Sequence, residues 1–554
     1  MPTIKIKAIS SLEKCFLDEH LEDKEEITRY TVFANQPLCY QIALTLTDSR
    51  LFKNRYHVCL KGDLAPYATM RRVVNMPNQF PCRETVEQDR NYLRFTPGLY
   101  PDLLRPLHYN SMVSLTNNEL HAVWISADLP EGFAAGEYSL TFELTDAKTL
   151  ELLATKTVSV RVLSTALPPQ RLIHTEWFYT DCIANHYHAR AFSERHWKLI
   201  ESFLRTATKN GINMILTPIF TPELDTYIGG ERLTTQLLGI EVIEKNKYAF
   251  DFSQVDRWVD LCHSAGVRYF EFAHFFTQWG ANHAPKIIAT VNGKKKRIFG
   301  WDTDACGEEY TAFLAQMITA LTDYLEQKGI LKNCFFHVSD EPHLEHLEQY
   351  MRCKNMIDPY LKGAPIIDAL SDYAFYETGA LKKPAPAIKH IAPFLQNKVE
   401  GLWAYYCGDS GVNVSGRMLA MSLGRTRILG IQLWLNNIEG FLHWGYNFYN
   451  NQNSYNVLDP FLHTDGEYFV PAGDAFLVYP GDDETAWESM RLNALREGIE
   501  DMRLLDLCAS RIGRDATESL VLEAAGGTLT FTEYPQDTNF LFHLREKLIA
   551  AIGE

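Results

Sequence analysis

The feature that most constrains the fold is an alternation of short apolar runs and amphipathic segments between residues 172 and 341. Runs rich in β-branched and aromatic residues, the composition of buried strands, lie at 172–178, 212–216, 268–272 and 334–338. The segments between them carry apolar residues at helical spacing, and the clearest such face comprises Tyr310, Phe313, Leu314, Met317, Ile318, Leu321, Tyr324 and Leu325. This alternation predicts parallel strands joined by helices.

The alternation continues after residue 341, which extends the prediction to a (β/α)8, TIM-like barrel. Short strands are expected at 365–368, 401–406, 430–434 and 440–444. A helical tail is expected over 487–511 and again after Pro535. None of the turns contains a dinucleotide fingerprint or a phosphate loop, so no nucleotide cofactor is expected.

The chain before the barrel reads as all-β. Residues 136–144 alternate strictly between apolar and polar side chains, and 157–162 return as the partner strand. An antiparallel β-sandwich is therefore expected, ending at the stiff segment Leu167-Pro168-Pro169-Gln170. The predicted domains are a β-sandwich at 1–168, a catalytic barrel at 169–512 and a C-terminal extension packed on the barrel at 513–554.

Composition excludes several classes of partner. Hydrophobic residues make up 46% of the chain and the formal net charge is −16, which argues for a globular protein and against binding to nucleic acid or to an anionic membrane. No run of about 18 apolar residues occurs that would span a membrane. The eleven cysteines form no Cys-x-x-Cys pair, and the first residues lack a signal-peptide pattern. A cytoplasmic location is expected, unless a leader has been removed.

Two adjacent carboxylates end the fourth predicted strand, in the sequence Ser339-Asp340-Glu341-Pro342. Pro342 prevents further strand pairing. In a parallel barrel, ligands bind at the carboxyl ends of the strands, so this pair is the candidate catalytic site. The structural alternative is a helix N-cap at Asp340, with Glu341 and Pro342 in the first turn.

Aromatic side chains and polar groups near other predicted strand ends indicate a sugar-binding rim. Sugars offer C–H faces for stacking and hydroxyls for hydrogen bonding. Each such residue has the alternative of being ordinary core. The candidate substrate-binding residues are Trp177, Asp181, His274, Trp403, Tyr405, Trp434, Trp444 and Tyr446.

The spacing of Asp340 and Glu341 favours one division of labour over another. Ordinary glycosidases place two carboxyl groups across the scissile bond, and sequence neighbours reach the two faces of a sugar ring only awkwardly. Neighbours suit substrate assistance, in which the 2-acetamido oxygen of the sugar attacks the anomeric carbon. One carboxylate then holds the amide N–H and stabilises the oxazolinium, and the other protonates the leaving oxygen.

Several segments resemble glycoside hydrolase family 123, the β-N-acetylgalactosaminidases, and its wider relatives. They are Ser339-Asp340-Glu341-Pro342 after an aromatic strand, Trp403-Ala404-Tyr405-Tyr406-Cys407-Gly408, Gly440-Phe441-Leu442-His443-Trp444-Gly445 and Leu495-Arg496-Glu497-Gly498-Ile499-Glu500-Asp501. The resemblance covers residues 170–510. It implies a β-sandwich followed by a barrel, and a retaining exo-glycosidase that needs no metal or other cofactor. It also implies that Asp340 stabilises the oxazoline and Glu341 is the acid/base.

The sequence is also compatible with three other hypotheses of function. A metal hydrolase would use His337, Asp340, His343 and His346, although their spacing matches no established metal site. A conventional glycosidase would use Glu341 as acid with Asp368 or Glu271 as nucleophile. The third reading is a sugar-binding barrel without catalysis.

Overall fold

The computed structural model describes residues 3–49, 53–83, 89–107, 112–278, 280–408 and 411–554. Contacts divide the chain into two compact units. Unit 1 comprises Met1–Arg171, Ser415–Leu435 and Trp487–Glu554, and unit 2 comprises Leu172–Val414 and Asn436–Ala486. Along the described part of the chain, no helix combines the length and the apolar character that crossing a bilayer requires.

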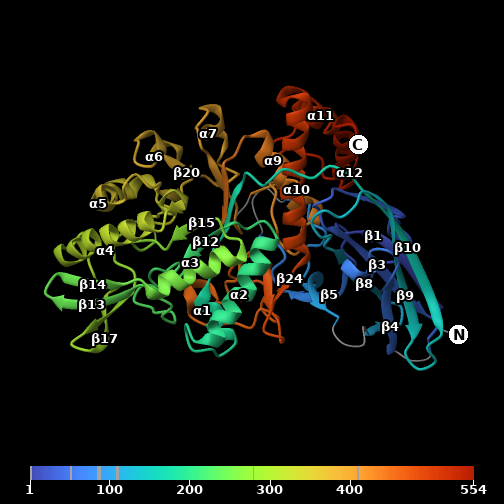
Figure 1. The fold of residues 1–554 in the computed structure, drawn as a ribbon, viewed down its shortest axis with the longest axis horizontal. Helices are drawn as coiled ribbons and strands as arrows, with labels where there is room; N and C mark the ends of the chain where they lie inside the picture. Colours follow the sequence, from blue (N-terminus) through green and yellow to red (C-terminus); the bar gives the residue numbers. More distant parts are fainter. Residues whose placement is uncertain (1–2, 50–52, 84–88, 108–111, 279, 409–410) are drawn as a thin grey trace. The chain divides into compact units, whose positions relative to one another are not determined.

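Two five-stranded sheets form the β-rich region of unit 1 (Figure 1). The first has the order β1 (Thr3–Ser10), β3 (Leu38–Thr47), β8 (Leu120–Ala127), β5 (Ala68–Asn78), β6 (Gly98–Pro106). The second has the order β2 (Arg29–Val32), β10 (Leu152–Val162), β9 (Gly136–Asp146), β4 (Lys53–Lys61), β7 (Met112–Thr116). Side chains of both sheets share one core, in which Leu140, Phe142 and Leu144 are fully buried as their alternation predicted.

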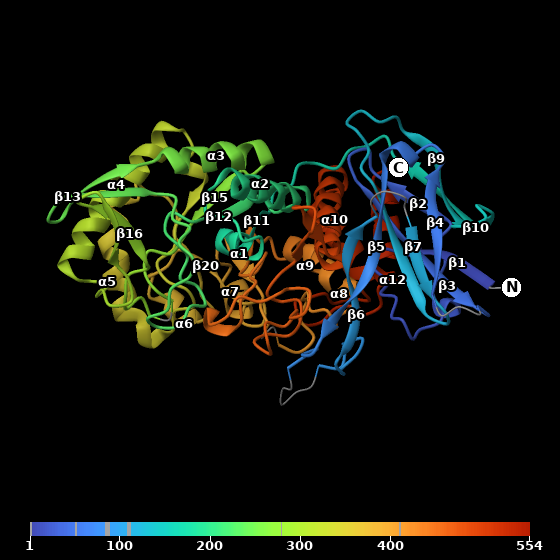
Figure 2. The ribbon, with the colours of Figure 1, turned by 90° about the horizontal axis from the view of Figure 1, so that it is seen from below.

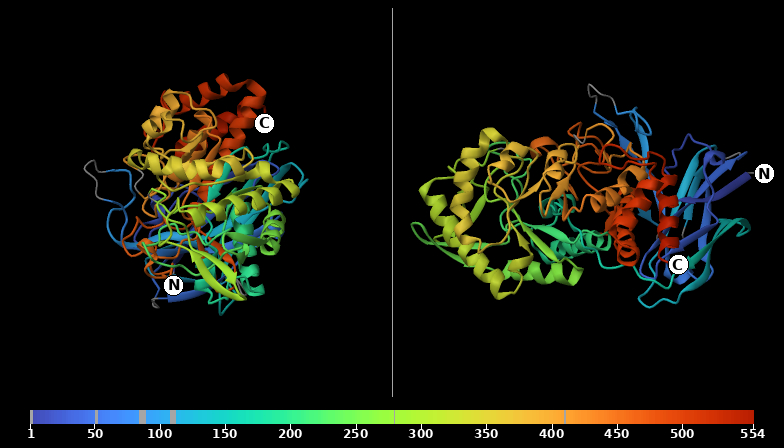
Figure 3. Two further views of the ribbon diagram at one scale, coloured as in Figure 1. Left: turned by 90° about the vertical axis from the view of Figure 1, so that its left-hand side faces the viewer. Right: turned by 90° about the horizontal axis from the view of Figure 1, so that it is seen from above.

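Helices from distant parts of the sequence complete unit 1. They are α8 (Leu423–Arg427), α9 (Leu429–Leu435), α10 (Met490–Ile512), α11 (Arg514–Ala524) and α12 (Asn539–Ala551). The last three form the red end of the chain in Figure 3 and pack on one another. Two glycines let α9 approach α10 closely, because a Cβ on Gly430 would lie 1.8 Å from the Gly498 carbonyl oxygen.

These contacts group the chain differently from the predicted domains. Segment 415–435 and the tail 487–554 belong to unit 1 with the β-rich region, whereas the predicted boundaries at 168 and 512 follow chain order. Buried ion pairs hold the grouping, since Arg427 donates to Glu497 at 2.8 Å and to Asp501 at 2.6 Å. The boundaries at 168 and 512 stay predictions.

Unit 2 is built on a six-stranded parallel sheet (Figure 2). Its order is β18 (Cys334–Phe335), β15 (Tyr269–Phe272), β12 (Met214–Thr217), β11 (Ile173–Glu176), β22 (Gly440–His443), β21 (Trp403–Tyr405). A separate parallel pair consists of β19 (Ile367–Ala369) and β20 (Lys383–Ala385). Apart from 430–434, the predicted parallel strands are therefore present, together with β20, which was not predicted. These eight strands do not pair as one continuous sheet over the described residues.

Helices follow the strands of unit 2 as the alternation predicted. They are α1 (Thr180–His186), α2 (Glu194–Lys209), α3 (Ser253–Ala265), α4 (Glu308–Gln327), α5 (Leu347–Ile357), α6 (Tyr373–Glu377) and α7 (Ala392–Gln396). Ser193 caps α2 by accepting from the His196 amide, and Gly266 ends α3 in the left-handed conformation. The basic run at 294–297 lies on a hairpin, because β16 (Ile287–Val291) pairs with β17 (Lys294–Phe299). A second hairpin, β13 (Gly239–Glu244) and β14 (Lys247–Asp251), joins it in one sheet.

Two strand predictions were wrong in extent or in kind. The expected strand 334–338 shortens to β18 because the amide of Val338 bonds the Asp368 carboxylate at 3.2 Å instead of a neighbouring strand. The expected strand 430–434 is part of α9. Its apolar residues are buried on all sides, and an apolar run of this length does not distinguish a buried strand from a buried helix.

Candidate active site

The loop that follows β18 carries both candidate carboxylates at the carboxyl edge of the parallel sheet. Asp340 and Glu341 are each partly exposed. Glu341 has a φ of 44°, in the left-handed region that costs energy for a residue other than glycine. Because this conformation ends the alternation of a strand, the two neighbouring carboxylates are free to face one site. The helix-cap alternative fails, since the following 3-10 turn starts at Leu344 and is capped by His343.

Tyr405 holds the Glu341 carboxylate. Its hydroxyl lies at the end of β21 and donates to Oε1 of Glu341 at 2.6 Å. Burial and the charge of Glu341 raise the pKa of Tyr405 well above its usual range, so the phenol stays a donor. Tyr405 is therefore a predicted rim residue that directly contacts a candidate catalytic carboxylate, Glu341.

The pKa of Asp340 is shifted by burial and by charged neighbours. Loss of hydration and the negative charge of Glu341 raise the pKa of Asp340 well above its usual range, whereas the positive charge of His337 acts in the opposite direction. A cation brought next to Asp340 would favour its ionised form.

A histidine with two acidic partners lies beneath the loop. The Nε2 of His337 is 2.6 Å from Oε1 of Glu271, and its Nδ1 is 3.0 Å from Oδ1 of Asp368. All three side chains are fully buried. Burial alone would lower the pKa of His337, but the hydrogen bonds and charges of Asp368 and Glu271 raise it to about 10. His337 is therefore an imidazolium between two carboxylates.

The other oxygens of these two acids are also engaged. Glu271 accepts from the indole of Trp177 at 2.7 Å and from the hydroxyl of Thr175 at 2.5 Å. Asp368 accepts from the hydroxyl of Tyr350 at 2.7 Å. We call Glu271, His337 and Asp368 the buried triad. Every carboxylate oxygen of the buried triad has a donor, so neither acid is placed to attack a substrate.

His274 packs against the buried triad. Its ring stacks on His337 with centroids 4.1 Å apart, and burial together with the His337 charge lowers the pKa of His274 well below its usual range. Ligand atoms of His274, His337 and Asp368 lie within 4.8 Å of one another, a distance compatible with a metal ion. However, both nitrogens of His337 are occupied by carboxylates, and an imidazolium has no lone pair for a metal. The donor set therefore fits an ion poorly.

The histidines of the metal alternative do not converge. His343 is exposed, and the His346 ring accepts from the His343 backbone amide at 3.2 Å. Both follow the catalytic loop at the start of the next helical turn. The residues predicted for a metal hydrolase therefore do not assemble into one ligand set.

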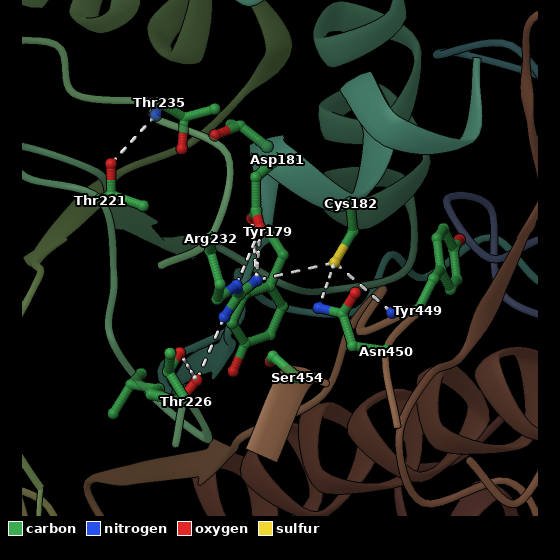
Figure 4. A network of polar contacts seen from close by, with 12 residues as sticks. Tyr179, Asp181, Cys182, Thr221, Thr226, Arg232, Thr235, Tyr449, Asn450 and Ser454 are labelled. Atoms are coloured by element: carbon green, nitrogen blue, oxygen red, sulfur yellow. Dashed lines mark hydrogen bonds and ion pairs between the residues drawn. The ribbon is translucent and has the colours of Figure 1, made fainter. Parts of the chain in front are cut away.

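Asp181 is bound by an arginine (Figure 4). Both of its oxygens accept from Arg232, at 2.8 Å from Nε and 2.8 Å from Nη2. The guanidinium also donates to the Leu224 carbonyl at 3.1 Å and lies over the Tyr179 ring. Asp181, predicted to bind substrate, is thus committed to an ion pair that anchors the segment between 224 and 232.

The remaining predicted aromatics differ in their surroundings. Trp444 is partly exposed and donates to Asp474 at 2.9 Å. Trp403 is fully buried, starts β21 at its amino end and covers Gly440. Tyr446 stacks on Phe178 and donates to a carbonyl of α2. Trp403 and Tyr446 thus lie in the core rather than at the rim.

Trp434 does not belong to this site. It lies on α9 in unit 1, its indole donates to Asp506 at 2.8 Å, and the Arg514 guanidinium lies 3.4 Å above its ring. Its placement at a strand end was wrong because the segment is helical.

Sequence reasoning missed one acidic residue near the pair. Glu223 follows β12, is 5% exposed and interacts electrostatically with Asp340. Its signal was available, because Thr221-Pro222-Glu223 places proline and a carboxylate after a strand, much as residues 340–342 do. Tyr350 and Asp474 were also missed, and no local pattern marks them.

Comparison with known proteins places the chain. The model of the glycoside hydrolase 123 catalytic domain matches residues 177–508. A family 123 glycoside hydrolase from Clostridium perfringens, analysed for glycolipid glycan hydrolysis, aligns with 16% identity, a TM-score of 0.73 and coverage of 99% of this chain and 98% of its own. A β-glucuronidase of Ruminococcus gnavus aligns at 8% identity over 90% of this chain and 98% of its own, with a TM-score of 0.33 that supports no common fold. No curated protein matches the chain by sequence.

Proposed function

The chain belongs to glycoside hydrolase family 123, and from this membership we propose that it is a retaining exo-enzyme that releases β-linked N-acetylhexosamine, of the N-acetylgalactosamine type, by substrate assistance. Asp340 and Glu341 are the reacting carboxylates. The sequence resemblance that suggested the family is confirmed, and the chain is a glycoside hydrolase.

One observation carries the substrate-assisted mechanism. A conventional retaining enzyme needs a carboxylate nucleophile opposite its acid, and the sequence offered Glu271 or Asp368. Both are fully buried with their oxygens occupied in the buried triad. The carboxylates left at the loop are sequence neighbours, which favours the sugar's own acetamido group as nucleophile.

In the first step the acetamido oxygen attacks the anomeric carbon and the glycosidic C–O bond breaks. Glu341 gives its proton to the leaving oxygen, and Asp340 accepts the amide N–H and faces the positive oxazolinium. In the second step Glu341 takes a proton from water, whose oxygen attacks the anomeric carbon and reopens the ring. The raised pKa of Asp340 in the free protein falls when the cationic intermediate forms beside it.

The six-stranded sheet and the β19–β20 pair support a distorted barrel as the scaffold of this site. A single parallel bridge joins Phe336, after β18, to Ile366, before β19, and another joins Ala387, after β20, to Tyr405 of β21. Together with the six-stranded sheet, these bridges lead from each strand to the next around a ring. We propose that this ring is the barrel that gathers its carboxyl ends around Asp340.

The test compares carboxylate variants on two substrates. Glu341→Gln should lose at least about 1000-fold in kcat on a disaccharide with a poor leaving group and far less on an activated aryl glycoside, which needs little proton donation. Asp340→Asn should be impaired on both. Glu345→Gln is the matched control, since its side chain is 78% exposed and pairs only weakly with His346.

A second test asks whether the reaction needs the 2-acetamido group of the sugar. A 2-hydroxy analogue of the same aryl glycoside should be a very poor substrate because it lacks the nucleophile. Equal turnover of the 2-hydroxy and 2-acetamido sugars would reject substrate assistance in favour of a conventional glycosidase.

A further inference from the structure

A third acidic side chain lies beside the catalytic pair without a role in the proposed mechanism. Glu223 belongs to the segment after β12 and is 95% buried, with 5% of its surface exposed. Neither of its carboxylate oxygens has a hydrogen-bond partner in the part of the chain that the structure describes. An unsatisfied buried carboxyl group is costly, which calls for an explanation.

The segment that carries Glu223 is tied down at several points. Its two ends meet where the Leu237 amide donates to the Pro218 carbonyl at 2.9 Å. The Asp225 amide donates to the side chain of Gln278 at 2.8 Å, and Arg232 holds the carbonyl of Leu224. Glu223 is therefore held in place on a fixed backbone.

The same contacts connect this segment to the catalytic loop. Thr277, next to Gln278 in sequence, accepts at its carbonyl from the hydroxyl of Ser339 at 3.0 Å. Ser339 directly precedes Asp340. The loops after β12, β15 and β18 are thus joined in order at one edge of the sheet, which brings Glu223 and Asp340 to the same site.

Resting on the proposed function, we infer that Glu223 is a substrate-binding residue that hydrogen-bonds a hydroxyl of the N-acetylhexosamine held by Asp340 and Glu341. A carboxylic acid donates one hydrogen bond and accepts others, and a sugar hydroxyl offers both counterparts. The ligand thereby satisfies a group that the fold leaves without a partner.

The electrostatic surroundings set the charge of Glu223. Burial and the charge of Asp340 raise the pKa of Glu223 to about 8, while its own backbone amide, Arg232 and His337 act in the opposite direction. The charge of Glu223 in turn contributes to the raised pKa of Tyr310 on α4. Glu223 is therefore mostly neutral near pH 7, and its ionisation around pH 8 adds a negative charge to the site.

The experiment measures hydrolysis of 4-methylumbelliferyl N-acetyl-β-galactosaminide by the full chain between pH 5 and 9. Glu223→Met removes both hydrogen-bonding functions at similar size and should raise KM about tenfold. Glu223→Gln keeps a neutral donor and acceptor, so it should lose only about threefold in kcat/KM at pH 6 and should not show the decline of the wild type above pH 8. Glu231→Gln is the control, on the same segment but paired with Lys286 at the surface.

Stability separates a binding role from a structural one. The folded protein binds the Glu223 proton more tightly than the unfolded chain, so this group costs stability as pH rises from about 4.3 toward 8. Glu223→Gln should thus have a higher Tm than the wild type at pH 8 and a nearly equal Tm at pH 5. N-acetylgalactosamine should raise the Tm of the wild type and raise that of Glu223→Met less.

The outcomes that overturn the inference are distinct from those that overturn the function. A Glu223→Met variant with wild-type KM and an unchanged sugar-induced Tm shift would reject Glu223 as a binding residue. Loss of activity in Glu223→Gln as complete as in Glu341→Gln would make it a reacting carboxylate instead. A wild type with neither hydrolysis nor a Tm shift would reject the proposed function and this inference with it.

Discussion

The carboxylates beneath the catalytic loop and those on it differ in how their charge is compensated. In the buried triad, Glu271 and Asp368 share the His337 imidazolium and receive further hydrogen bonds from Trp177 and Tyr350. On the loop, burial and the adjacent charge of Glu341 both raise the pKa of Asp340. Only His337 of the triad is close to the loop carboxylates in sequence, three residues before Asp340.

In the proposed mechanism, this difference separates acids that stabilise the fold from acids that react. A buried carboxylate with all its donors in place is low in energy and unreactive, whereas a crowded pair with incomplete compensation gains when a cationic intermediate forms next to it. The loop also carries backbone strain, because Glu341 is in the left-handed conformation.

The largest effect should come from breaking the buried triad. His337→Gln removes the cation and leaves two buried carboxylates facing each other, which should cost about 3–5 kcal/mol in the free energy of unfolding. It should also suppress activity, because the charge of His337 lowers the pKa of Asp340. Urea unfolding and kcat/KM on the aryl glycoside measure both effects.

A double-variant cycle provides the control. Glu271→Gln combined with His337→Gln should be less destabilised than the sum of the single variants, because the pair is then neutral. Additive losses would show that the triad is not a coupled unit, and the comparison with the loop would fail.

The pH dependence of the triad has a defined sign. The folded protein holds the His337 proton up to about pH 10, whereas an unfolded histidine releases it near pH 6.5. The stability from this group is complete below pH 6.5 and declines as pH rises toward 10. The wild type should therefore lose more stability than His337→Gln between pH 7 and pH 10. If urea unfolding shows that the wild type and His337→Gln lose equal free energy of unfolding between pH 7 and pH 10, His337 is not charged in the folded protein.

An intermediate effect should come from the contact that links the loop to its neighbour strand. Tyr405→Phe removes the 2.6 Å hydrogen bond to Glu341, and a hydrogen bond is worth about 0.5–1.5 kcal/mol, or roughly 2- to 13-fold in rate. The loss should fall on kcat, with Tm nearly unchanged. Ser371→Ala is the control, since that hydroxyl lies 3.5 Å from the Tyr405 hydroxyl and does not touch Glu341. Wild-type kcat in Tyr405→Phe would show that Glu341 needs no orientation from β21.

Sequence patterns predicted the parts of the molecule that rest on local periodicity. The helical face on α4 and the alternation in β9 are dictated by neighbouring residues, so they could be read directly. The adjacent carboxylates after β18 could be placed at the sheet edge for the same reason. The mechanism and the exact sugar remain proposals.

The rest depends on contacts between distant residues. No local pattern distinguishes Trp403, which covers a glycine in the core, from Tyr405 two residues later, which binds Glu341. Asp181 looked like a site residue until Arg232, about fifty positions away, was seen to occupy both its oxygens. Whether a polar residue at a strand end binds substrate or stabilises the fold thus depends on its hydrogen-bond and ion-pair partners, which the sequence does not reveal.

The smallest effect on activity is expected at Trp434, which was predicted to lie at the sugar-binding rim but belongs to unit 1. Trp434→Phe removes the hydrogen bond to Asp506 and weakens the contact with Arg514, which should cost about 1–2 kcal/mol of stability. KM and kcat on the aryl glycoside should stay within about twofold of the wild type, because Trp434 contacts Asp506 and Arg514 within unit 1, whereas Asp340 and Glu341 belong to unit 2. A tenfold rise in KM with unchanged Tm would return Trp434 to the sugar site. It would also show that a side chain whose polar groups are all bonded within the protein can still bind substrate. The distinction between the buried triad and the loop carboxylates would then lose its basis.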